Sequence, residues 1–428
     1  LRLRRGIARL LATFDPRQAA EAYDRIIEMA TANLPPDAIS APSWLDDSSE
    51  ALPAWETLDD RVALADLLQN KLGNANAARQ ELHRILRRDL RHAPAYPPLM
   101  ELYSKSGQND RAERVRALLS LLGYAGPGAG GFGDRRQGAR LFAYRNALSD
   151  ELRWRHLFPQ LLRGTPYFEF LQLTLDGLLR LFPPPWPLPV ETQPASRLWD
   201  AGFKVALADA QRLFGLEVEV LFAAQVPGYV LALEPLQAGG RPVVVMEQSV
   251  LERTDVERRF LLGRALEPLR SGYALLLRLS TTEATQWLRL CRALLSSAED
   301  RAALYDSDGG EALSAAAKDF ASQLTRPAQQ ALERLSQKNP LTPNMLSPES
   351  FFSALPVFAD RAGLLLCDDI SAAVRVMARA QGEELAVVEG HGGGILLGQV
   401  SGGAELARYY LSDSYHDLVS SLRDTTRL

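Results

Sequence analysis

The sequence predicts a mainly α-helical protein that carries one small β-sheet. Apolar residues recur at helical spacing over most of the 428 residues, whereas the runs that predict strands are confined to positions 216–246. A pattern of small residues also repeats after 34 residues near the N-terminus, which is typical of stacked helical pairs. We therefore expect an N-terminal arm of paired helices followed by an α+β domain with a small sheet.

The composition is that of a folded protein, with 46% hydrophobic and 23% charged residues and a formal net charge of −4. This charge balance predicts neither nucleic-acid binding nor attachment to an anionic membrane. No run of about 18 apolar residues predicts a membrane span, and the basic first residues lack the apolar core of a signal peptide. We expect a cytoplasmic protein. Because the chain begins with Leu1, we also expect that more repeats precede it.

The first 123 residues predict a helical-repeat arm. Gly73 and Ala78 recur 34 residues later as Gly107 and Ala112, within similar surroundings. This spacing resembles that of tetratricopeptide repeats, in which each unit is a pair of helices. Because the two helices of a pair approach closely at small residues, we expect the glycines late in the first helix and the alanines in the second.

Other parts of the arm are less regular. An imperfect unit surrounds Ala20, residues 34–49 are rich in Pro, Ser and Asp and predict a long loop, and Pro94 or Pro97 marks the break before the next helical pair. Residues 124–134 are rich in Gly and predict a linker. The linker lacks the Lys of a phosphate-binding loop, so we do not expect nucleotide binding there.

Positions 135–199 predict bridging helices and a proline-rich connector. Ser149 or Asp150 can begin the first helix, because both side chains accept hydrogen bonds from exposed backbone N–H groups. A second helix is predicted over 168–182 and ends at the prolines of 183–189, which we interpret as a rigid spacer.

The remaining residues, 200–428, predict the α+β domain. A helix over 198–214 precedes three predicted strands, at 216–223, 229–233 and 242–246. Thr254 and Glu257 then form a capping box, which predicts a helix start. Further helices are predicted over 281–338 and 346–380, and a last one from about 404.

The helix after the capping box resembles the active-site helix of zinc metallopeptidases of the H-E-x-x-H type, the zincins. In that family an apolar run and a Gly lead into the motif, as Leu262 and Gly263 do here. This frame assigns three residues to the positions of the first His, the catalytic Glu and the second His, namely Arg264, Ala265 and Pro268.

Three further segments extend the resemblance. Residues 358–364 are similar to the E-x-x-A-D-R-x-G segment that supplies the third zinc ligand, and the position of its Glu is taken by Pro356. Residues 241–250 look like the edge strand that precedes the active-site helix, and residues 406–415 look like the closing helix. The resemblance implies a zincin-like domain over 200–428.

The same resemblance implies that the metal chemistry is lost. The two His of the motif bind one zinc ion and the Glu acts on its water. Arg264 is a permanent cation, Ala265 takes up no proton, and neither Pro268 nor Pro356 has a ligand atom. We therefore expect no catalytic residue, metal or cofactor. Pro268 also predicts an opening or kink in the helix.

Arg264 suggests a structural substitute for the metal. Its guanidinium stands where a zinc ion supplies positive charge in the family, and it can pair with Asp360 or with Glu267. We expect such a pair to hold the former cleft together, and Arg264 and Asp360 are accordingly candidate binding residues.

Arginines of the arm are the other candidates for binding. They alternate with acidic residues, which favours a solvated helix face with ion pairs. The alternative is a groove for a peptide or an acidic partner, since helical repeats bind peptides on their concave face. Its candidate residues are Arg84, Arg87, Arg88, Arg91, Tyr103 and Arg111.

The histidines and cysteines give no clear second site. Cys291 and Cys367 are far apart in apolar helical surroundings, which predicts two buried thiols. The five histidines are scattered, and His391 in a Gly-rich loop is interpreted as part of a surface turn. A relocated zinc site would need ligands such as His156, His391 and His416.

These patterns predict a non-catalytic scaffold that binds protein partners through the arm. Two alternatives stay open. One is an active zinc metallohydrolase with relocated ligands, which zinc analysis would detect, and the other is a structural subunit of a larger assembly, which a size measurement would detect.

Overall fold

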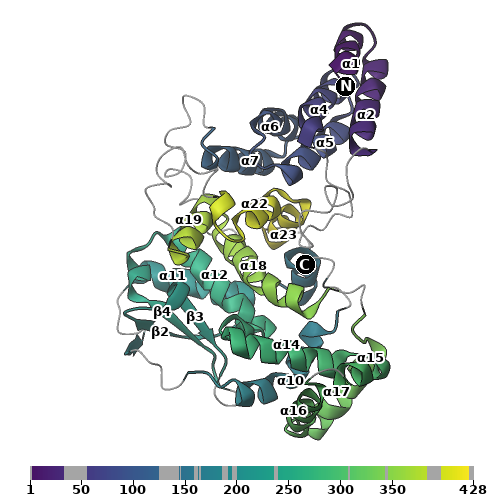
Figure 1. Cartoon of the computed structure of the whole chain (residues 1–428). Coiled ribbons are helices and arrows are strands. Elements are labelled where there is room, and N and C mark those ends of the chain that lie inside the picture. Colours follow the sequence, from purple (N-terminus) through teal and green to yellow (C-terminus); the bar gives the residue numbers. More distant parts are fainter. Residues whose placement is uncertain are drawn as a thin grey trace. The chain divides into compact units, whose positions relative to one another are not determined.

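The computed structural model describes residues 2–32, 55–124, 144, 146–158, 162, 165–185, 191–194, 200–235, 240–306, 309–342, 346–382 and 397–423. The prediction of a mainly helical protein with one small sheet is confirmed (Figure 1). The chain forms two compact units. Unit 1 contains residues 1–138 and 382–416, and unit 2 contains residues 139–381 and 417–428.

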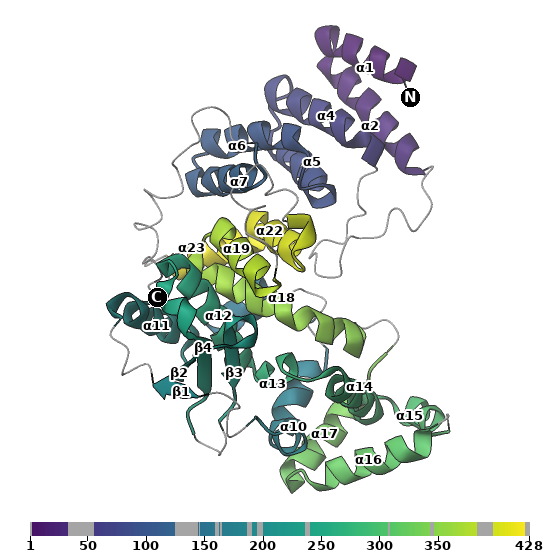
Figure 2. The same ribbon diagram turned by 60° about the vertical axis from the view of Figure 1, so that its left-hand side comes forward.

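Unit 1 is built largely from helices that pack in consecutive pairs (Figure 2). Its first pairs are α1 (Arg2–Phe14) with α2 (Pro16–Ala32), α4 (Leu58–Asn70) with α5 (Ala75–Arg88), and α6 (Tyr96–Lys105) with α7 (Asn109–Leu121). The short 3-10 turns η1 (Trp55–Thr57) and η2 (Ala93–Ala95) precede α4 and α6. Pro97 lies in the first turn of α6, where its missing N–H costs no hydrogen bond. The predicted loop over 34–49 lies outside the described residues.

The repeated alanines and glycines of unit 1 have different roles. Ala78 and Ala112 are buried in the second helix of their pairs, as predicted. The expectation for the glycines is wrong, because Gly73 and Gly107 follow the first helices and a Cβ at either position would meet no atom within 4 Å. Both have a positive φ, +66° and +74°. They are therefore suited to left-handed turns, and close helix packing does not explain them.

The C-terminal part of unit 1 packs on α7. Helix α22 (Gly403–Leu411) contacts α7, and Arg408 Nε donates a hydrogen bond of 3.0 Å to the carbonyl oxygen of Arg87. Helix α23 (Asp413–Arg423) follows after Ser412, so the single predicted C-terminal helix is in fact two. The sequence groups this region with residues 200–381, whereas the contacts group residues 382–416 with the arm.

Unit 2 contains a four-stranded mixed sheet in the order β1-β2-β4-β3. β2 (Glu219–Ala223) and β4 (Val243–Glu247) are parallel, and β3 (Val230–Leu233) and β1 (Thr192–Pro194) run antiparallel to their neighbours. β4 therefore lies inside the sheet, and the comparison of residues 241–250 with an edge strand is wrong. β1 was not predicted, because it is three residues long and ends in a Pro that only an edge strand tolerates well.

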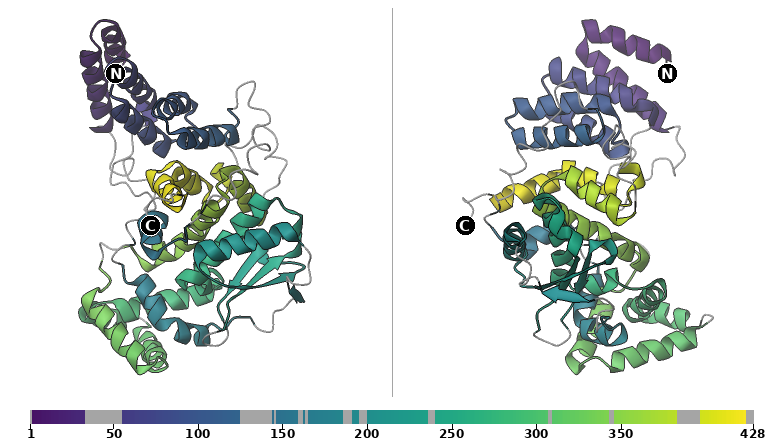
Figure 3. Two further views of the ribbon diagram at one scale, coloured as in Figure 1. Left: turned by 180° about the vertical axis from the view of Figure 1, so that it is seen from behind. Right: turned by 90° about the vertical axis from the view of Figure 1, so that its left-hand side faces the viewer.

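Helices pack against this sheet (Figure 3). Phe203 of α11 (Ala201–Phe214) contacts Phe222 of β2 with ring centroids 5.2 Å apart, and α12 (Asp255–Ser271) packs on β3. Ion pairs attach α12 to two neighbours, since Arg259 lies 2.8 Å from Asp209 of α11, and Arg379 of α19 (Ile370–Ala380) lies 2.7 Å from Glu257. The predicted capping box of Thr254 and Glu257 is confirmed.

The other helices of unit 2 include a second group that packs around α10 and α14. Gly177 of α10 lies against Leu324 and Phe320, so that a Cβ there would collide with Leu324. The remaining helices and short helical turns of unit 2 have the following bounds: α9 (Asp150–Leu152), the π-turn η3 (Arg153–Leu157), α10 (Tyr167–Leu181), η6 (Pro227–Tyr229), η7 (Gln248–Glu252), α13 (Ala274–Leu277), α14 (Thr281–Leu295), α15 (Ala298–Tyr305), α16 (Gly310–Ser322), α17 (Arg326–Lys338), α18 (Pro348–Cys367) and α19 (Ile370–Ala380). Ser149 caps α9, as predicted.

Among the described helices of unit 2, α12 and α18 form the most extensive contact, and they cross closely. A Cβ on Gly263 would lie 2.6 Å from the carbonyl oxygen of Ala362, and a Cβ on Gly363 would lie 2.6 Å from that of Phe260. Only glycines allow the two backbones to approach so closely. The structure thus brings together the two segments that resemble zincin motifs. By length and composition α18 could span a membrane, but 78% of its apolar window is buried.

The prolines do not break these helices. α12 continues through Pro268 to Ser271, and α18 continues through Pro356 to Cys367. The predicted opening at Pro268 is therefore wrong, whereas a kink there stays a prediction. Pro268 lies in the last turn of α12, so its ring removes only the hydrogen bond to the carbonyl of Arg264 and little helix follows it.

Candidate functional site

The crossing of α12 and α18 carries an ion pair between two predicted site residues. Arg264 Nε lies 2.8 Å from Asp360 Oδ1, which places the guanidinium beside one of its two predicted partners. The N–H is not directed at this oxygen, because Oδ1 accepts no hydrogen bond of ordinary geometry within the described part of the chain. The contact is therefore a close ion pair between Arg264 and Asp360.

The environment of the pair is asymmetric. Asp360 is buried, whereas the Arg264 side chain keeps 24% of its surface exposed. Burial raises the pKa of Asp360, and the charge of Arg264 lowers it in part. The guanidinium therefore neutralises a carboxylate that the interior of the helix crossing would otherwise disfavour.

The other three positions that the resemblance assigns to the metal site are not gathered in one place. Ala265 and Pro268 are buried in the core of unit 2, whereas Pro356 is exposed on α18. The described residues bring together no group of three or more His, Cys, Asp or Glu side chains at metal-binding distance. Among the ligands of the alternative hydrolase, His156 belongs to unit 2 and His416 to unit 1, while His391 lies outside the described residues.

Glu267, the second predicted partner of Arg264, belongs to a different buried cluster. Ser271 Oγ donates a hydrogen bond to Glu267 Oε1, and Arg153 Nη1 lies 3.7 Å from the same oxygen. Burial raises the pKa of Glu267 to about 7, and the charge of Arg153 opposes this shift. Tyr273 is also buried there. Its burial raises the pKa of its hydroxyl most, and the negative charge of Glu267 raises this pKa further.

This buried cluster could take part in proton transfer only if a substrate reached it. Glu267 Oε2 and the Tyr273 hydroxyl lack a hydrogen-bond partner among the described residues. Both side chains are fully buried, and Tyr273 packs edge-on against Phe168 with ring centroids 6.0 Å apart. The cluster is therefore enclosed by side chains, and its chemical consequence is a stability that depends on pH.

The candidate arginines of the arm are mostly engaged within unit 1. Arg84 pairs with Glu81, Arg88 lies over the ring of Trp55 at 4.6 Å, and Arg91 lies 3.9 Å from Asp89. The backbone carbonyl of Arg87 accepts the hydrogen bond from Arg408. These contacts match the predicted alternation of charges on the helix faces.

Tyr103 and Arg111 face the C-terminal helices of unit 1. Tyr103 is buried, and its hydroxyl lies 2.6 Å from His83 Nε2. Arg111 lies over the Tyr103 ring at 5.5 Å and pairs with Asp413. Burial lowers the pKa of His83 to about 4, which keeps this imidazole neutral near pH 7. These candidate binding residues therefore hold parts of the same unit together.

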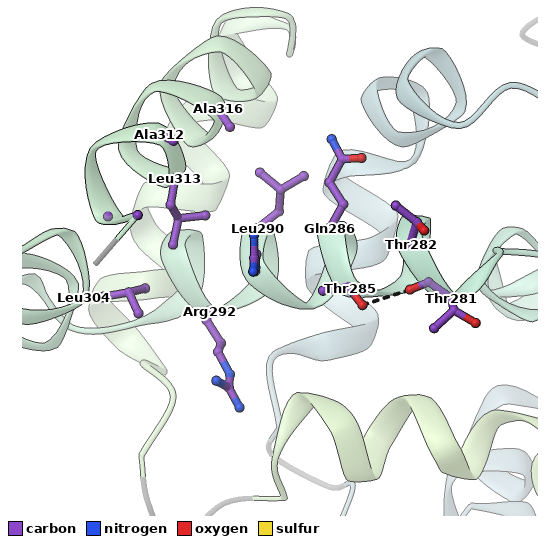
Figure 4. A pocket seen from close by; sticks show the side chains of 13 residues that line it. Thr281, Thr282, Thr285, Gln286, Leu290, Arg292, Leu304, Ala312, Leu313 and Ala316 are labelled. Carbon is purple, nitrogen blue, oxygen red and sulfur yellow. Dashed lines mark hydrogen bonds between the residues drawn. The ribbon is translucent and has the colours of Figure 1, made fainter. Parts of the chain in front are cut away.

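Unit 2 also has an open groove of about 730 Å³ between α14 and the α15–α16 hairpin (Figure 4). Leu290 of α14 and Leu313 of α16 line it from its two sides, whereas Arg292 points away from α16. Arg292 pairs with Glu349 at 2.6 Å, but Arg289, which also lines the groove, has no carboxylate within ion-pair distance among the described residues. Thr281, Thr282 and Thr285 also line the groove, and the Thr285 hydroxyl donates a hydrogen bond of 2.8 Å to the carbonyl oxygen of Thr281. Such a groove can hold a ligand with an apolar body and an anionic group.

Several of these features have no signal in the sequence. Arg153, Ser271 and Tyr273 come from separate segments, and no spacing rule joins them to Glu267. The groove depends on how α14 and α16 diverge, which periodicity does not specify. No protein-family model, curated protein or solved structure matches the chain.

Proposed function

We propose that the chain is a non-catalytic scaffold that binds protein partners, built from a tetratricopeptide-like arm over 1–123 and a degenerate zincin-like domain over 200–428. The arm recruits the partner, and the domain offers a second docking surface or supports the arm. The protein acts in the cytoplasm, without cofactor, nucleic acid or membrane.

The ion pair of Arg264 and Asp360 is the observation that carries this proposal. A guanidinium 2.8 Å from a buried carboxylate takes the position where the resemblance expects the first metal ligand. A divalent cation placed there would be repelled by Arg264 and would compete with it for Asp360. Gly263 and Gly363 let the backbones of the two helices approach closely at the same crossing.

The helical pairs of unit 1 support the binding role. Paired helices that stack in series present extended faces, and partner binding is their common use. Those faces carry charged side chains and are not uniformly apolar. They would therefore distinguish partners by the sign and position of their charges. The groove beside α14 is a second surface on which a partner could contact unit 2.

Two assays on the full chain test this proposal. The first follows hydrolysis of quenched fluorescent peptides with and without added zinc, and we expect no cleavage in either condition. The second captures partners on the immobilised chain and rebuilds the complex from purified components, and we expect a stoichiometric complex. Zinc-dependent cleavage together with no complex would favour the hydrolase. A large assembly of this chain alone would favour the structural subunit.

A further inference from the structure

The groove between α14 and the α15–α16 hairpin carries polar side chains that have no partner within the described part of the chain. Thr281, Thr282, Gln286 and Arg289 line the groove and are exposed, and their side chains make no hydrogen bond or ion pair with the described residues. All four lie within about 140° of the circumference of α14. One wall of the groove therefore offers several hydrogen-bonding groups and one positive charge to a ligand.

The other wall of the groove is apolar. It is formed by Leu304 of α15 and by Ala312, Leu313 and Ala316 of α16. Ala312 and Ala316 are exposed and lie one helical turn apart, so a ligand can approach the backbone of α16 closely. Figure 4 shows Leu304 and Leu313 at the side of the groove that is distant from Thr281. A ligand that fills the groove contacts a polar wall and an apolar wall together.

The groove has the length of a short extended peptide. Its lining on α14 runs from Thr281 to Arg292, which is about 16 Å of helix. An extended chain covers the same length with about five residues. The volume of about 730 Å³ lies in the range of ligand-binding clefts.

A peptide would use both walls of the groove. Its backbone N–H and C=O groups need hydrogen-bond partners, which the hydroxyls of Thr281 and Thr282 and the amide of Gln286 can supply. In an extended segment, side chains two positions apart point to the same side, so two of them can enter the groove together. A fatty acid would leave the polar wall unused and much of its chain exposed to water in this open groove.

Arg289 determines the charge that the groove accepts. The described residues that line the groove include two arginines and no Asp or Glu. Arg292 already pairs with Glu349, so Arg289 is the cation that a ligand can bind. A guanidinium donates hydrogen bonds to a carboxylate in a fixed planar geometry. An acidic side chain of the peptide would therefore pair with Arg289, and a basic one would be repelled.

We propose that this groove binds a short extended segment of a partner protein in which a large apolar residue and an Asp or Glu stand two positions apart. The apolar side chain lies against Leu304 and Leu313, and the carboxylate pairs with Arg289. The backbone of the segment forms hydrogen bonds with Thr281 and Thr282. This inference rests on the proposed scaffold function and assigns a ligand to its second docking surface.

Selection from a phage library of random seven-residue peptides tests the inference. The immobilised full chain is the target, and one enriched peptide is then synthesised with a fluorescent label for anisotropy measurements. We expect the enriched peptides to share an apolar residue and an acidic residue two positions apart. Replacing the acidic residue of the synthetic peptide by Lys should weaken its binding at least about tenfold.

Two pairs of variants locate the binding. Ala316→Trp fills the groove with an indole ring and should weaken binding at least about tenfold, whereas Ala315→Trp, at an exposed position of α16 outside the lining, should leave it unchanged. Arg289→Glu should weaken binding of the acidic peptide and strengthen binding of its Lys form. Arg334→Glu, at an exposed arginine of α17 outside the groove, should change neither. Circular dichroism checks that each variant folds, which is expected because the four substituted side chains are exposed.

Three outcomes would overturn the inference. They are a selection that enriches no peptide even if the chain binds oleate, enriched peptides that lack an acidic residue, and undiminished binding of the synthetic peptide to the Ala316→Trp or Arg289→Glu chain. If the Ala316→Trp chain still forms the complex rebuilt from its captured partner, the scaffold function stands and this groove does not carry it. If the parent chain binds the peptide but forms no complex with any partner, the scaffold function fails by itself.

Discussion

Asp360 and Arg264 depend on each other at the crossing of α12 and α18. The carboxylate is buried and the guanidinium 2.8 Å away offsets its charge. When one member of such a pair is removed, the other remains as an uncompensated charge in a poorly solvated place. The pair therefore stabilises the crossing mainly by preventing this penalty.

A double-mutant cycle measures this dependence. Arg264→Met should lower the free energy of unfolding of unit 2 by about 2 kcal/mol, because Asp360 stays buried without its cation. Asp360→Asn in the Arg264→Met background should recover part of this loss, because the amide carries no charge. Urea denaturation of the four proteins at pH 7 gives the coupling energy.

The control for this cycle is the pair of Arg292 and Glu349. Both side chains are about half exposed at a distance of 2.6 Å. Arg292→Met should therefore change the free energy of unfolding by less than about 0.5 kcal/mol. Strictly additive effects of Arg264→Met and Asp360→Asn would show that the ion pair contributes nothing.

Glu267 should make unit 2 less stable at higher pH. Its pKa in the folded chain is about 7, above the ordinary value of 4.5, so the folded state holds a proton that the unfolded chain has released. The stability that protonated Glu267 contributes is fully present below pH 4.5 and is lost as the pH rises through 7. The free energy of unfolding falls by about 3 kcal/mol over that window. Buried Asp360 contributes with the same sign.

Glu267→Gln isolates this contribution. Gln keeps the shape of Glu and can accept the hydrogen bond from Ser271, but it does not ionise. Urea denaturation at pH 5, 6, 7 and 8 should therefore show a shallower fall in stability for the variant than for the parent chain. Parallel curves for the two proteins would mean that Glu267 does not titrate in this range.

At the scale of elements, the crossing of α12 and α18 depends on two glycines. A methyl group on Gly263 would lie 2.6 Å from a backbone oxygen of α18, and no flexible side chain can move to relieve that contact. Gly263→Ala should lower the free energy of unfolding by about 1–3 kcal/mol, since the helices must separate. The decrease should appear in urea denaturation and as a lower Tm.

Gly6→Ala is the matched control for that prediction. Gly6 also lies inside a helix, but a Cβ there would meet nothing within 4 Å. Because Ala is the better helix former, Gly6→Ala should be neutral or stabilising by up to about 1 kcal/mol. Equal effects at Gly6 and Gly263 would mean that helix propensity, and not the crossing, determines the result.

The sequence predicts elements better than their contacts. Helix starts with local signals, such as the capping box of Thr254 and Glu257, are predicted correctly because the signal and the structure involve the same residues. The role of Gly73 was misinterpreted, because a repeated glycine can mean close packing or a positive φ and the spacing is the same for both. A proline inside a helical pattern also has two outcomes, because it interrupts a helix only where more helix follows it. Pro268 lies in the last turn of α12, and the sequence does not show where that helix ends.

At the scale of the molecule, only some contacts between distant segments can be predicted from the sequence. Arg264 and Asp360 could be matched because two motifs gave each a role in one site, although Glu267 was an equal candidate. The contact of Arg111 with Asp413 joins segments about 300 residues apart, and composition contains no signal for it. Grouping residues 382–416 with the arm depends on such contacts, which is why the predicted boundaries differ.

Zinc content is the most direct measurement of the central claim, that a guanidinium and a carboxylate stand where a metal site would be. The full chain is dialysed against zinc and then against buffer, its zinc is measured by atomic emission, and its Tm is recorded with and without a chelator. We expect far less than one zinc ion per chain and an unchanged Tm. One retained zinc ion per chain, lost together with several degrees of Tm when His156 or His391 is replaced by Ala, would contradict it.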